Sequence, residues 1–323
     1  MSIIHQIIAP VKQEMMEFET KFRDSMNSDV AMLDKVTHYI IKRKGKQVRP
    51  LFVFLCAKML GEVTPKTYDA ATLIELLHTA TLVHDDVVDD ANERRGYFSI
   101  NALWKNKIAV LVGDYMLSKI LLLSIHKKNP DLLEIIARSV KDMSEGELLQ
   151  IEKARLLDIN EKIYFDIIRK KTASLIASCC ESAALSSGNN ENQEKMRLFG
   201  EYIGIAFQIK DDIFDYGKPG KIGKPTGIDI RERKLTLPII FTLNNSTKEV
   251  RKELINIIKN KNELSKSINR AMILVKENGG IEYSHEQMLI YSTKALEIIK
   301  DFPENEAKKS LKLLVDYTIN REI

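Results

Sequence analysis

Two clusters of aspartate are the residues whose types and spacing could do chemistry in this sequence. Both have the pattern DDxxD: Asp85, Asp86 and Asp89 form the first, and Asp211, Asp212 and Asp215 form the second. In a helix, the first and last aspartates of the pattern lie one turn apart on one face, where like charges repel. Carboxylate oxygens select hard cations, which predicts binding of Mg²⁺, or of Mn²⁺ in its place. Mg²⁺ completes its shell with water and substrate phosphates, so two such clusters facing each other would bind a diphosphate.

Cations that suit a diphosphate lie near both clusters in the sequence. Arginine binds phosphate through two parallel hydrogen bonds, and lysine binds it as a point charge. The cations are Lys46 and Arg49, Arg94 and Arg95 after the first cluster, Lys171 before an apolar segment, and Lys224 and Lys234 after the second cluster. His78 lies seven residues before Asp85, two helical turns away on the same face. The combination predicts a metal-assisted diphosphate site.

Long helices are expected to position these residues. Glycine and proline are scarce, at 14 and 8 of 323 residues, which favours helices over many short strands. Apolar residues recur with a helical period over residues 69–90, 131–155, 162–187 and 194–215. There is no convincing alternating strand, and the last third also reads as helical. We therefore predict an all-α protein, with the two aspartate clusters at the ends of apolar helices.

Composition excludes several other classes of protein. The net charge of +4, from 49 basic and 45 acidic residues, does not indicate nucleic-acid binding. The three cysteines lack the spacing of a zinc site or a disulfide scaffold, which favours a reducing compartment. The first 18 residues read as an amphipathic helix rather than a signal peptide, and the longest apolar run, residues 51–57, is far shorter than the ~20 residues of a membrane span. We expect a cytoplasmic protein with at most transient membrane contact.

Five ordered motifs resemble the trans-isoprenyl diphosphate synthases of the polyprenyl synthetase family, over nearly the whole chain. The family's GKxxRP is found at residues 45–50, its DDxxD followed by RRG at 85–96, and its KTA at 171–173. Its FQxxDDxxD is found at 207–215 and its GKPxGxDLxxGKxTLP at 223–238, with Arg233 where the family usually has glycine. The similarity is greatest to medium- and long-chain enzymes of the octaprenyl diphosphate synthase type. It implies one domain over residues 1–323, a helical bundle around a central cavity, and a homodimer.

The resemblance also implies a role for each matching residue. Asp85, Asp89 and Asp211 would bind Mg²⁺, and Asp86, Asp212 and Asp215 would support them in catalysis. Isopentenyl diphosphate would be bound by Lys46, Arg49, His78 and Arg95. The allylic diphosphate would be bound by Arg94, Lys171, Thr172, Gln208, Lys224 and Lys234, with Lys171 also counted as catalytic.

Product length is expected to depend on the residues one turn before Asp85. In the family, bulky aromatic residues there stop growth at fifteen carbons, whereas this chain has the small residues Ala80 and Thr81. The resemblance therefore implies a medium- or long-chain polyprenyl diphosphate, a quinone side-chain precursor, made from farnesyl or geranylgeranyl diphosphate. The alternatives are a geranylgeranyl diphosphate (C20) synthase, a class I terpene cyclase, or a non-catalytic subunit of a heteromeric synthase. A class I terpene cyclase would not need Lys46, Arg49 and Arg95, because it binds no second diphosphate. Non-catalytic subunits usually lose aspartates, whereas this chain keeps both clusters.

Overall fold

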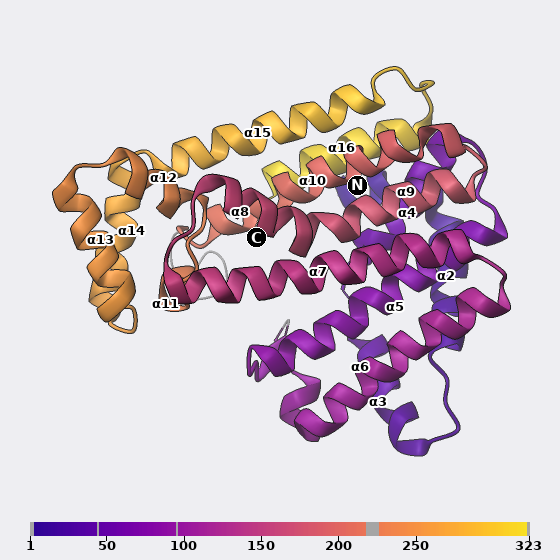
Figure 1. The fold of residues 1–323 in the computed structure, drawn as a ribbon. Coiled ribbons are helices and arrows are strands. Elements are labelled where there is room, and N and C mark those ends of the chain that lie inside the picture. Colours follow the sequence, from indigo (N-terminus) through magenta and orange to yellow (C-terminus); the bar gives the residue numbers. More distant parts are fainter. Residues whose placement is uncertain (1–2, 44, 95, 218–225, 322–323) are drawn as a thin grey trace. The chain divides into compact units, whose positions relative to one another are not determined.

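Helices form nearly all of the chain in the computed structural model, which describes residues 3–43, 45–94, 96–217 and 226–321 (Figure 1). The chain divides into two compact units. The first comprises residues 1–140, 175–197 and 302–311, and the second comprises residues 141–174, 198–301 and 312–323. The helices α7, α9, α10 and α16 contribute residues to both units. The prediction of an all-α protein is confirmed.

The first unit is built mainly from the N-terminal helices. Its elements are α1 (Ile3–Ile8), η1 (Ala9–Val11), α2 (Lys12–Ser25), α3 (Ala31–Lys42), α4 (Val48–Leu60), α5 (Pro65–Val88), β1 (Glu93–Arg94), β2 (Tyr97–Phe98), α6 (Ile100–His126), the start of α7 (Pro130–Leu156), nearly all of α9 (Ser174–Ser186), η3 (Asn190–Asn192) and the starts of α10 (Gln193–Phe214) and α16 (Glu306–Asn320). The second unit holds the rest of α7, α10 and α16, together with α8 (Glu161–Ile168), the π-helical turn η2 (Arg169–Ala173), α11 (Ile228–Arg231), α12 (Leu237–Asn245), α13 (Lys248–Asn260), α14 (Ser265–Glu277) and α15 (Gly280–Ile299).

The core of the first unit is organised around α4. This helix is apolar on all sides and buries almost every residue from Pro50 to Ala57, as expected of a helix enclosed by others. Phe18 of α2 meets Phe54 of α4 edge to face, with ring centroids 6.0 Å apart. The next helix, α5, begins with a capping box between Thr64 and Thr67. The N-terminal helices therefore fix α5, which carries the first aspartate cluster.

Helix α6 lies along α5, and the two approach closely at one glycine (Figure 1). A Cβ on Gly113 would lie 2.1 Å from Nε2 of His84, so a larger residue here would have to displace the histidine ring. The same imidazole nitrogen lies 3.2 Å from the carbonyl oxygen of Val110. The close packing fixes the last turns of α5 against α6.

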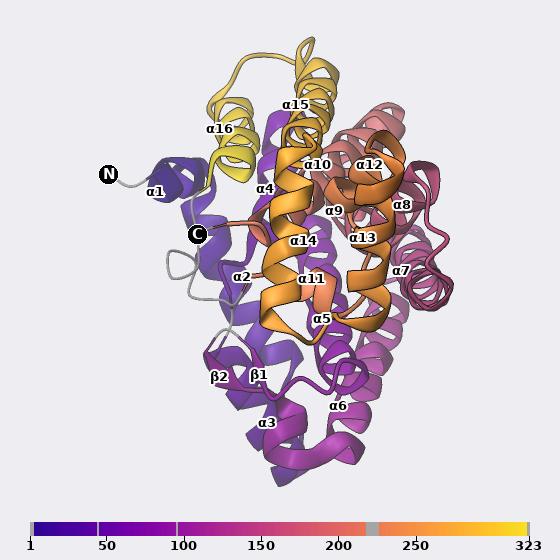
Figure 2. The same cartoon turned by 90° about the vertical axis from the view of Figure 1, so that its left-hand side faces the viewer.

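A short hairpin follows α5, although the sequence indicates no strand. β1 pairs antiparallel with β2, with Gly96 at φ +76° in the turn. The hairpin lies beside α3 (Figure 2), where the Tyr39 hydroxyl donates to the Phe98 carbonyl at 2.7 Å. The Arg43 guanidinium lies 3.6 Å from the centroid of the Tyr97 ring. These contacts hold the segment that carries Arg94.

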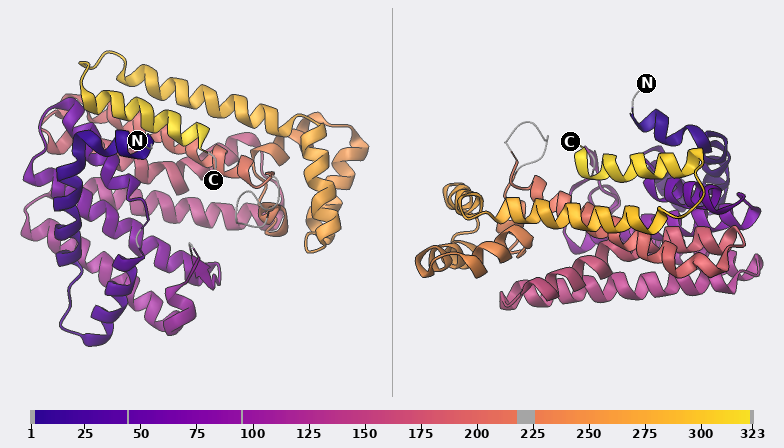
Figure 3. Two further views of the ribbon diagram at one scale, coloured as in Figure 1. Left: turned by 180° about the vertical axis from the view of Figure 1, so that it is seen from behind. Right: turned by 90° about the horizontal axis from the view of Figure 1, so that it is seen from above.

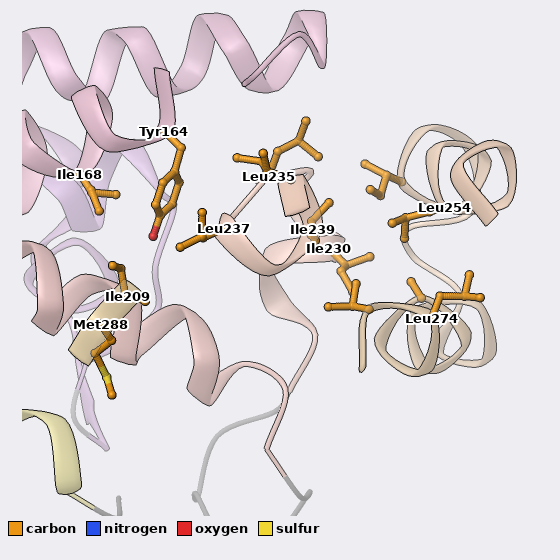
Figure 4. Close-up of a cluster of buried hydrophobic side chains, with 14 of the residues drawn as sticks. Tyr164, Ile168, Ile209, Ile230, Leu235, Leu237, Ile239, Leu254, Leu274 and Met288 are labelled. Atoms are coloured by element: carbon orange, nitrogen blue, oxygen red, sulfur yellow. The ribbon is translucent and has the colours of Figure 1, made fainter. Parts of the chain in front are cut away.

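An apolar cluster forms the core of the second unit (Figure 4). It joins Tyr164 and Ile168 of α8 with Ile209 of α10, Leu237 of α12 and Leu274 of α14. Helices α13 and α14 lie side by side near the start of α15 (Figure 3). The cluster thus supports both the residues before Lys171 and the helix that carries the second aspartate cluster.

Two expectations from sequence need correction. The helical period over residues 162–187 predicts one helix, but the π-helical turn η2 interrupts it at Arg169–Ala173. The expectation that no segment approaches a membrane span overlooks α6, which is long and apolar enough to cross a membrane by length and composition. Only 33% of its most apolar window is buried. Much of its apolar surface is therefore left exposed in a single chain.

Candidate active site

The first aspartate cluster occupies the last turn of α5. Asp89 caps the helix, and its N–H donates to the Asp85 carbonyl at 2.8 Å. This continuous turn keeps Asp85 and Asp89 on one face. Asp86 points elsewhere: it is 3% exposed, and its Oδ1 accepts a hydrogen bond of 2.7 Å from Nε of Arg94. Burial raises the pKa of Asp86, while the Arg94 charge acts in the opposite direction.

The first unit also brings together two predicted ligands of isopentenyl diphosphate. Nη1 of Arg49 lies 2.8 Å from Nε2 of His78. Since arginine can only donate, Nε2 of His78 is the acceptor and the imidazole helps to orient Arg49. Lys46 is exposed and lies just before α4, next to Gln47, which has a left-handed backbone at φ +48°.

The residues that precede Asp85 on α5 are small, as the sequence shows. Ala80 is completely buried, and Thr81 is half-buried with its hydroxyl donating to the His78 carbonyl at 3.0 Å. Neither side chain is large enough to block a passage along this part of α5.

The second aspartate cluster ends α10, and each aspartate has a different set of partners. Asp211 forms an ion pair with Arg321, whose guanidinium also lies 4.1 Å from the Phe207 ring centroid. Asp215 accepts hydrogen bonds from the backbone N–H groups of Ile228 and Asp229, at 2.9 and 3.0 Å. Burial raises the pKa of Asp215, and these bonds oppose the rise. Asp215 therefore anchors the segment that leads to Lys234.

Asp212 lies at the centre of a hydrogen-bonded chain. Its Oδ1 accepts from Nε2 of Gln208 at 2.9 Å, and its Oδ2 accepts from the Tyr164 hydroxyl at 2.7 Å. Oε1 of Gln208 in turn accepts from the Thr172 hydroxyl at 2.8 Å. Burial raises the pKa of Asp212 to about 7, with the neighbouring charges of Asp211 and Asp215 adding to the rise.

A cavity of about 130 Å³ opens beside this chain, within the second unit. Its polar wall combines two cations with hydrogen-bonding groups, and its apolar wall is formed by isoleucine and leucine. The lining residues include Lys171, Thr172, Gln208, Asp212, Asp229 and Lys234 on the polar side, and Ile167, Ile168 and Leu235 on the apolar side. Four of the predicted allylic diphosphate ligands therefore line one cavity.

Carboxylates hold the two lysines of this cavity. Nζ of Lys171 lies 2.5 Å from Glu147 and 2.8 Å from Oε1 of Gln150, both on α7. Nζ of Lys234 lies 2.5 Å from Glu232, and its backbone N–H donates to the Asp229 carbonyl. Burial raises the pKa of Asp229 well above its usual range. Asp229 lies inside the motif at residues 223–238, but no role for it was predicted from the sequence.

The π-helical turn that carries Lys171 and Thr172 is held between two glycines. A Cβ on Gly146 of α7 would lie 2.8 Å from the backbone nitrogen of Lys171, and one on Gly204 of α10 would lie 2.5 Å from Cα of Ala173. Both distances are shorter than real Cβ atoms allow. Single π turns are frequent at functional sites, and here the turn aims two predicted ligands into the cavity.

A backbone feature explains the departure from the family pattern at Arg233. The residue has φ +58°, in the left-handed region that glycine adopts most readily. The turn is therefore formed with arginine in place of the usual glycine. Two predicted ligands, Arg95 and Lys224, lie outside the described residues.

Carboxylates at both clusters fit a hard divalent ion that uses few protein ligands. Among the described residues, no three His, Cys, Asp or Glu side chains gather into a preformed metal site. Mg²⁺ needs no such cage, because one or two carboxylates suffice when phosphate oxygens and water complete its shell. The two clusters belong to different units, and their apposition around one substrate stays a prediction.

Comparison with known proteins identifies the family. The sequence model of the family described as Polyprenyl synthetase matches residues 30–275. The chain belongs to the polyprenyl synthetase family. It is a prenyltransferase of the polyprenyl diphosphate synthase type.

Relatives of this polyprenyl synthetase include long-chain and shorter-chain enzymes. An all-trans-nonaprenyl-diphosphate synthase (geranyl-diphosphate specific) from Rhodobacter capsulatus is 34% identical, covering 98% of this chain and 97% of the relative. A polyprenyl synthase from Caulobacter crescentus, solved with calcium and isoprenyl diphosphate, is 31% identical with a TM-score of 0.91, covering 99% and 98% of the two chains. A geranylgeranyl pyrophosphate synthase from Bacteroides thetaiotaomicron is 38% identical with a TM-score of 0.85, covering 99% and 100%.

Proposed function

We propose that this polyprenyl synthetase condenses isopentenyl diphosphate with an allylic diphosphate, farnesyl or geranylgeranyl, in a Mg²⁺-dependent reaction. The product is a medium- or long-chain all-trans polyprenyl diphosphate, used as a quinone side-chain precursor. The cavity that gathers Lys171, Thr172, Gln208 and Lys234 is the observation that carries the proposal. The Caulobacter crescentus relative, which binds calcium and isoprenyl diphosphate, supports the choice of ligands.

The residues of the cavity would hold the allylic diphosphate as its C–O bond breaks. Mg²⁺ on Asp85, Asp89 and Asp211 would supply further positive charge for the departing oxygens. Lys171 and Lys234 are already fixed by carboxylates, so little reorganisation accompanies the development of negative charge. The apolar wall excludes water, which would otherwise quench the allylic cation.

The second substrate would be bound in the first unit. Arg49 and His78 hold each other at 2.8 Å, and we propose that they bind isopentenyl diphosphate together with Lys46 and Arg95. Arg94, fixed by Asp86, would contact the allylic diphosphate with Lys224. The isopentenyl double bond then attacks the allylic cation, and the proton lost afterwards passes to the released diphosphate.

Small residues on α5 support a long product. Ala80 and Thr81 are small residues where phenylalanine or tyrosine would limit growth of the product. The nonaprenyl relative also makes a long chain by its name. A C20 synthase is the second candidate, because a geranylgeranyl synthase is 38% identical to this chain. A non-catalytic subunit is disfavoured because both aspartate clusters are intact.

We also propose that the protein acts as a homodimer in the cytoplasm, with residues 1–323 as one domain. The exposed apolar residues of α6 between positions 110 and 125 share one face of the helix. They are Val110, Leu111, Leu121, Leu122 and Ile125, each at least 40% exposed. A second copy covering this face would bury apolar surface of the kind found in stable dimers, and this explains the apolar character of α6 without a membrane.

A product assay tests the function. Purified protein is incubated with Mg²⁺, labelled isopentenyl diphosphate and farnesyl or geranylgeranyl diphosphate, and the dephosphorylated products are sized by reverse-phase chromatography. We expect a ladder that extends well beyond C20. A ladder that ends at C20 would replace the long-chain assignment with the second candidate, and no elongation with any allylic primer would overturn the catalytic assignment.

A further inference from the structure

Tyr164 is a buried residue that neither the aspartate clusters nor the basic motifs include. It lies on α8, is 3% exposed, and packs in the apolar core of the second unit (Figure 4). Its hydroxyl is nevertheless directed at a carboxylate, with a distance of 2.7 Å to Oδ2 of Asp212. The ring also lines the cavity that holds Lys171 and Lys234. A tyrosine that presents its apolar body to a core and its hydroxyl to a site is well suited to fix other groups.

Both carboxylate oxygens of Asp212 are engaged by protein groups. Asp212 is 5% exposed, and each of its two oxygens accepts a short hydrogen bond, one from Tyr164 and one from Gln208. Its neighbours Asp211 and Asp215 are only partly buried. Asp212 is therefore arranged as an anchor for protein groups.

The hydrogen bonds from Thr172 to Gln208 and from Gln208 to Asp212 both donate toward Asp212. Nε2 of Gln208 donates to Oδ1 of Asp212, so the amide nitrogen of Gln208 faces the carboxyl group. The amide oxygen then faces the Thr172 hydroxyl, which donates to it at 2.8 Å. The orientation of Gln208 and Thr172 is thus set by Asp212, and that of Asp212 by Tyr164.

We propose that Tyr164 is a positioning residue for the allylic diphosphate, acting through Asp212 on Gln208 and Thr172. The inference rests on the proposed function, in which Gln208 and Thr172 bind that substrate. Loss of the hydroxyl leaves Oδ2 of Asp212 buried without its donor, so the carboxylate rotates or shifts toward another group. Gln208 and Thr172 then lose the fixed geometry that they present to the cavity.

The test compares Tyr164→Phe with a matched control, Tyr283→Phe. The Tyr283 hydroxyl also donates to a carboxylate at 2.7 Å, that of Glu161 at the start of the same helix α8. Glu161 and Tyr283 do not line the cavity. Both variants lose one hydroxyl–carboxylate hydrogen bond to the same region of the second unit, so Tyr283→Phe shows what such a loss does away from the cavity.

We expect Tyr164→Phe to raise KM for the allylic substrate about tenfold, equivalent to about 1.4 kcal/mol, while KM for isopentenyl diphosphate stays unchanged. Calorimetric binding of the non-hydrolysable probe farnesyl thiodiphosphate should weaken by a similar factor. Tyr283→Phe should change neither constant. In a double-mutant cycle, Tyr164→Phe and Gln208→Ala should be strongly non-additive, since both act through Asp212.

Two results would overturn the inference while leaving the proposed function intact. One is an unchanged allylic KM and probe affinity in Tyr164→Phe, and the other is an equal rise in KM for both substrates. If Tyr164→Phe fails to fold, Asp212→Asn tests the next link of the same chain. Its amide oxygen can still accept from Tyr164, but its NH2 group then faces the amide nitrogen of Gln208, so the hydrogen bond to Gln208 is lost. A rise in the allylic KM alone is again expected, and an unchanged allylic KM would overturn the inference. Failure of the unmodified protein to elongate any primer would instead overturn the proposed function.

Discussion

Replacing Gly204 with alanine tests how tightly α10 packs against the π-helical turn. The change should favour helix formation but introduce a steric clash with the turn, and the two effects have opposite signs. In an exposed helix this change would stabilise the protein by about 1 kcal/mol. Here the added Cβ would lie 2.5 Å from Cα of Ala173, whereas ordinary contact begins at 3.4 Å. The turn and α10 must therefore separate by about 0.9 Å, the difference between these two distances. Overpacking of this kind costs about 1–3 kcal/mol, so we expect a net loss of about 1 kcal/mol.

The same displacement should reach the allylic site. The hydrogen bond between Thr172 and Gln208 is 2.8 Å long, and a shift approaching 1 Å takes it beyond the ~3.5 Å at which such a bond is effectively lost. Losing it removes about 1 kcal/mol of interaction, which corresponds to a fall of about fivefold in kcat/KM for the allylic substrate. KM for isopentenyl diphosphate should stay unchanged.

Urea unfolding and steady-state kinetics measure these effects, with Gly280→Ala as the matched control. A Cβ on Gly280 would lie 2.4 Å from the Pro238 carbonyl, an equally short contact on another helix of the second unit. Gly280→Ala should therefore destabilise the protein without a selective change in the allylic KM. Higher stability of Gly204→Ala, together with an unchanged allylic kcat/KM, would refute the reasoning.

Four further changes have defined outcomes. Ala80→Phe should shorten the longest product on reverse-phase chromatography, because Ala80 is buried beneath the first cluster; an unchanged product distribution would contradict this. Arg233→Gly should raise the free energy of unfolding in urea by about 1 kcal/mol, because φ +58° costs an L-residue about that much; equal stability would count against backbone strain. Tyr97→Leu should raise KM for the allylic substrate severalfold and Tyr97→Phe should not, because the ring that stacks on Arg43 holds the hairpin that carries Arg94; equal effects would exclude the cation–π contact as the cause. Chelation by EDTA should abolish elongation and added Mg²⁺ should restore it, and elongation that persists in EDTA would contradict the metal requirement.

Local pattern was enough to predict the helices that carry the clusters. The helical period of apolar residues over 69–90 corresponds to α5, which ends at Val88. The same period over residues 194–215 corresponds to α10, which ends at Phe214. Periodicity succeeds in such cases because one face of each helix packs against a core. The ordered motifs then named the family, which the comparison with known proteins confirmed.

The π-helical turn and the role of Tyr164 could not be predicted in this way. Apolar spacing continues through residues 162–187, so the insertion at Arg169–Ala173 leaves no break in the pattern. Its cause is tertiary, since Gly146 and Gly204 allow two other helices to approach the turn. Tyr164 and Asp212 are 48 residues apart in sequence, and nothing local to either indicates the contact. Gly146 and Gly204, two of the glycines within helical segments, are the sequence signal for this packing.

The pairing of the proposed substrate-binding cations with carboxylates is best understood as positioning rather than stabilisation. Arg94 pairs with Asp86, Lys171 with Glu147, and Lys234 with Glu232. Partly exposed pairs of this kind contribute little to folding free energy, because solvent screens them and ordering two long side chains costs entropy. That ordering has a use in a transferase, because a cation already held in place loses less freedom when a diphosphate binds. The fixed charges then face the oxygens on which negative charge develops, which is the arrangement that accelerates ionisation most.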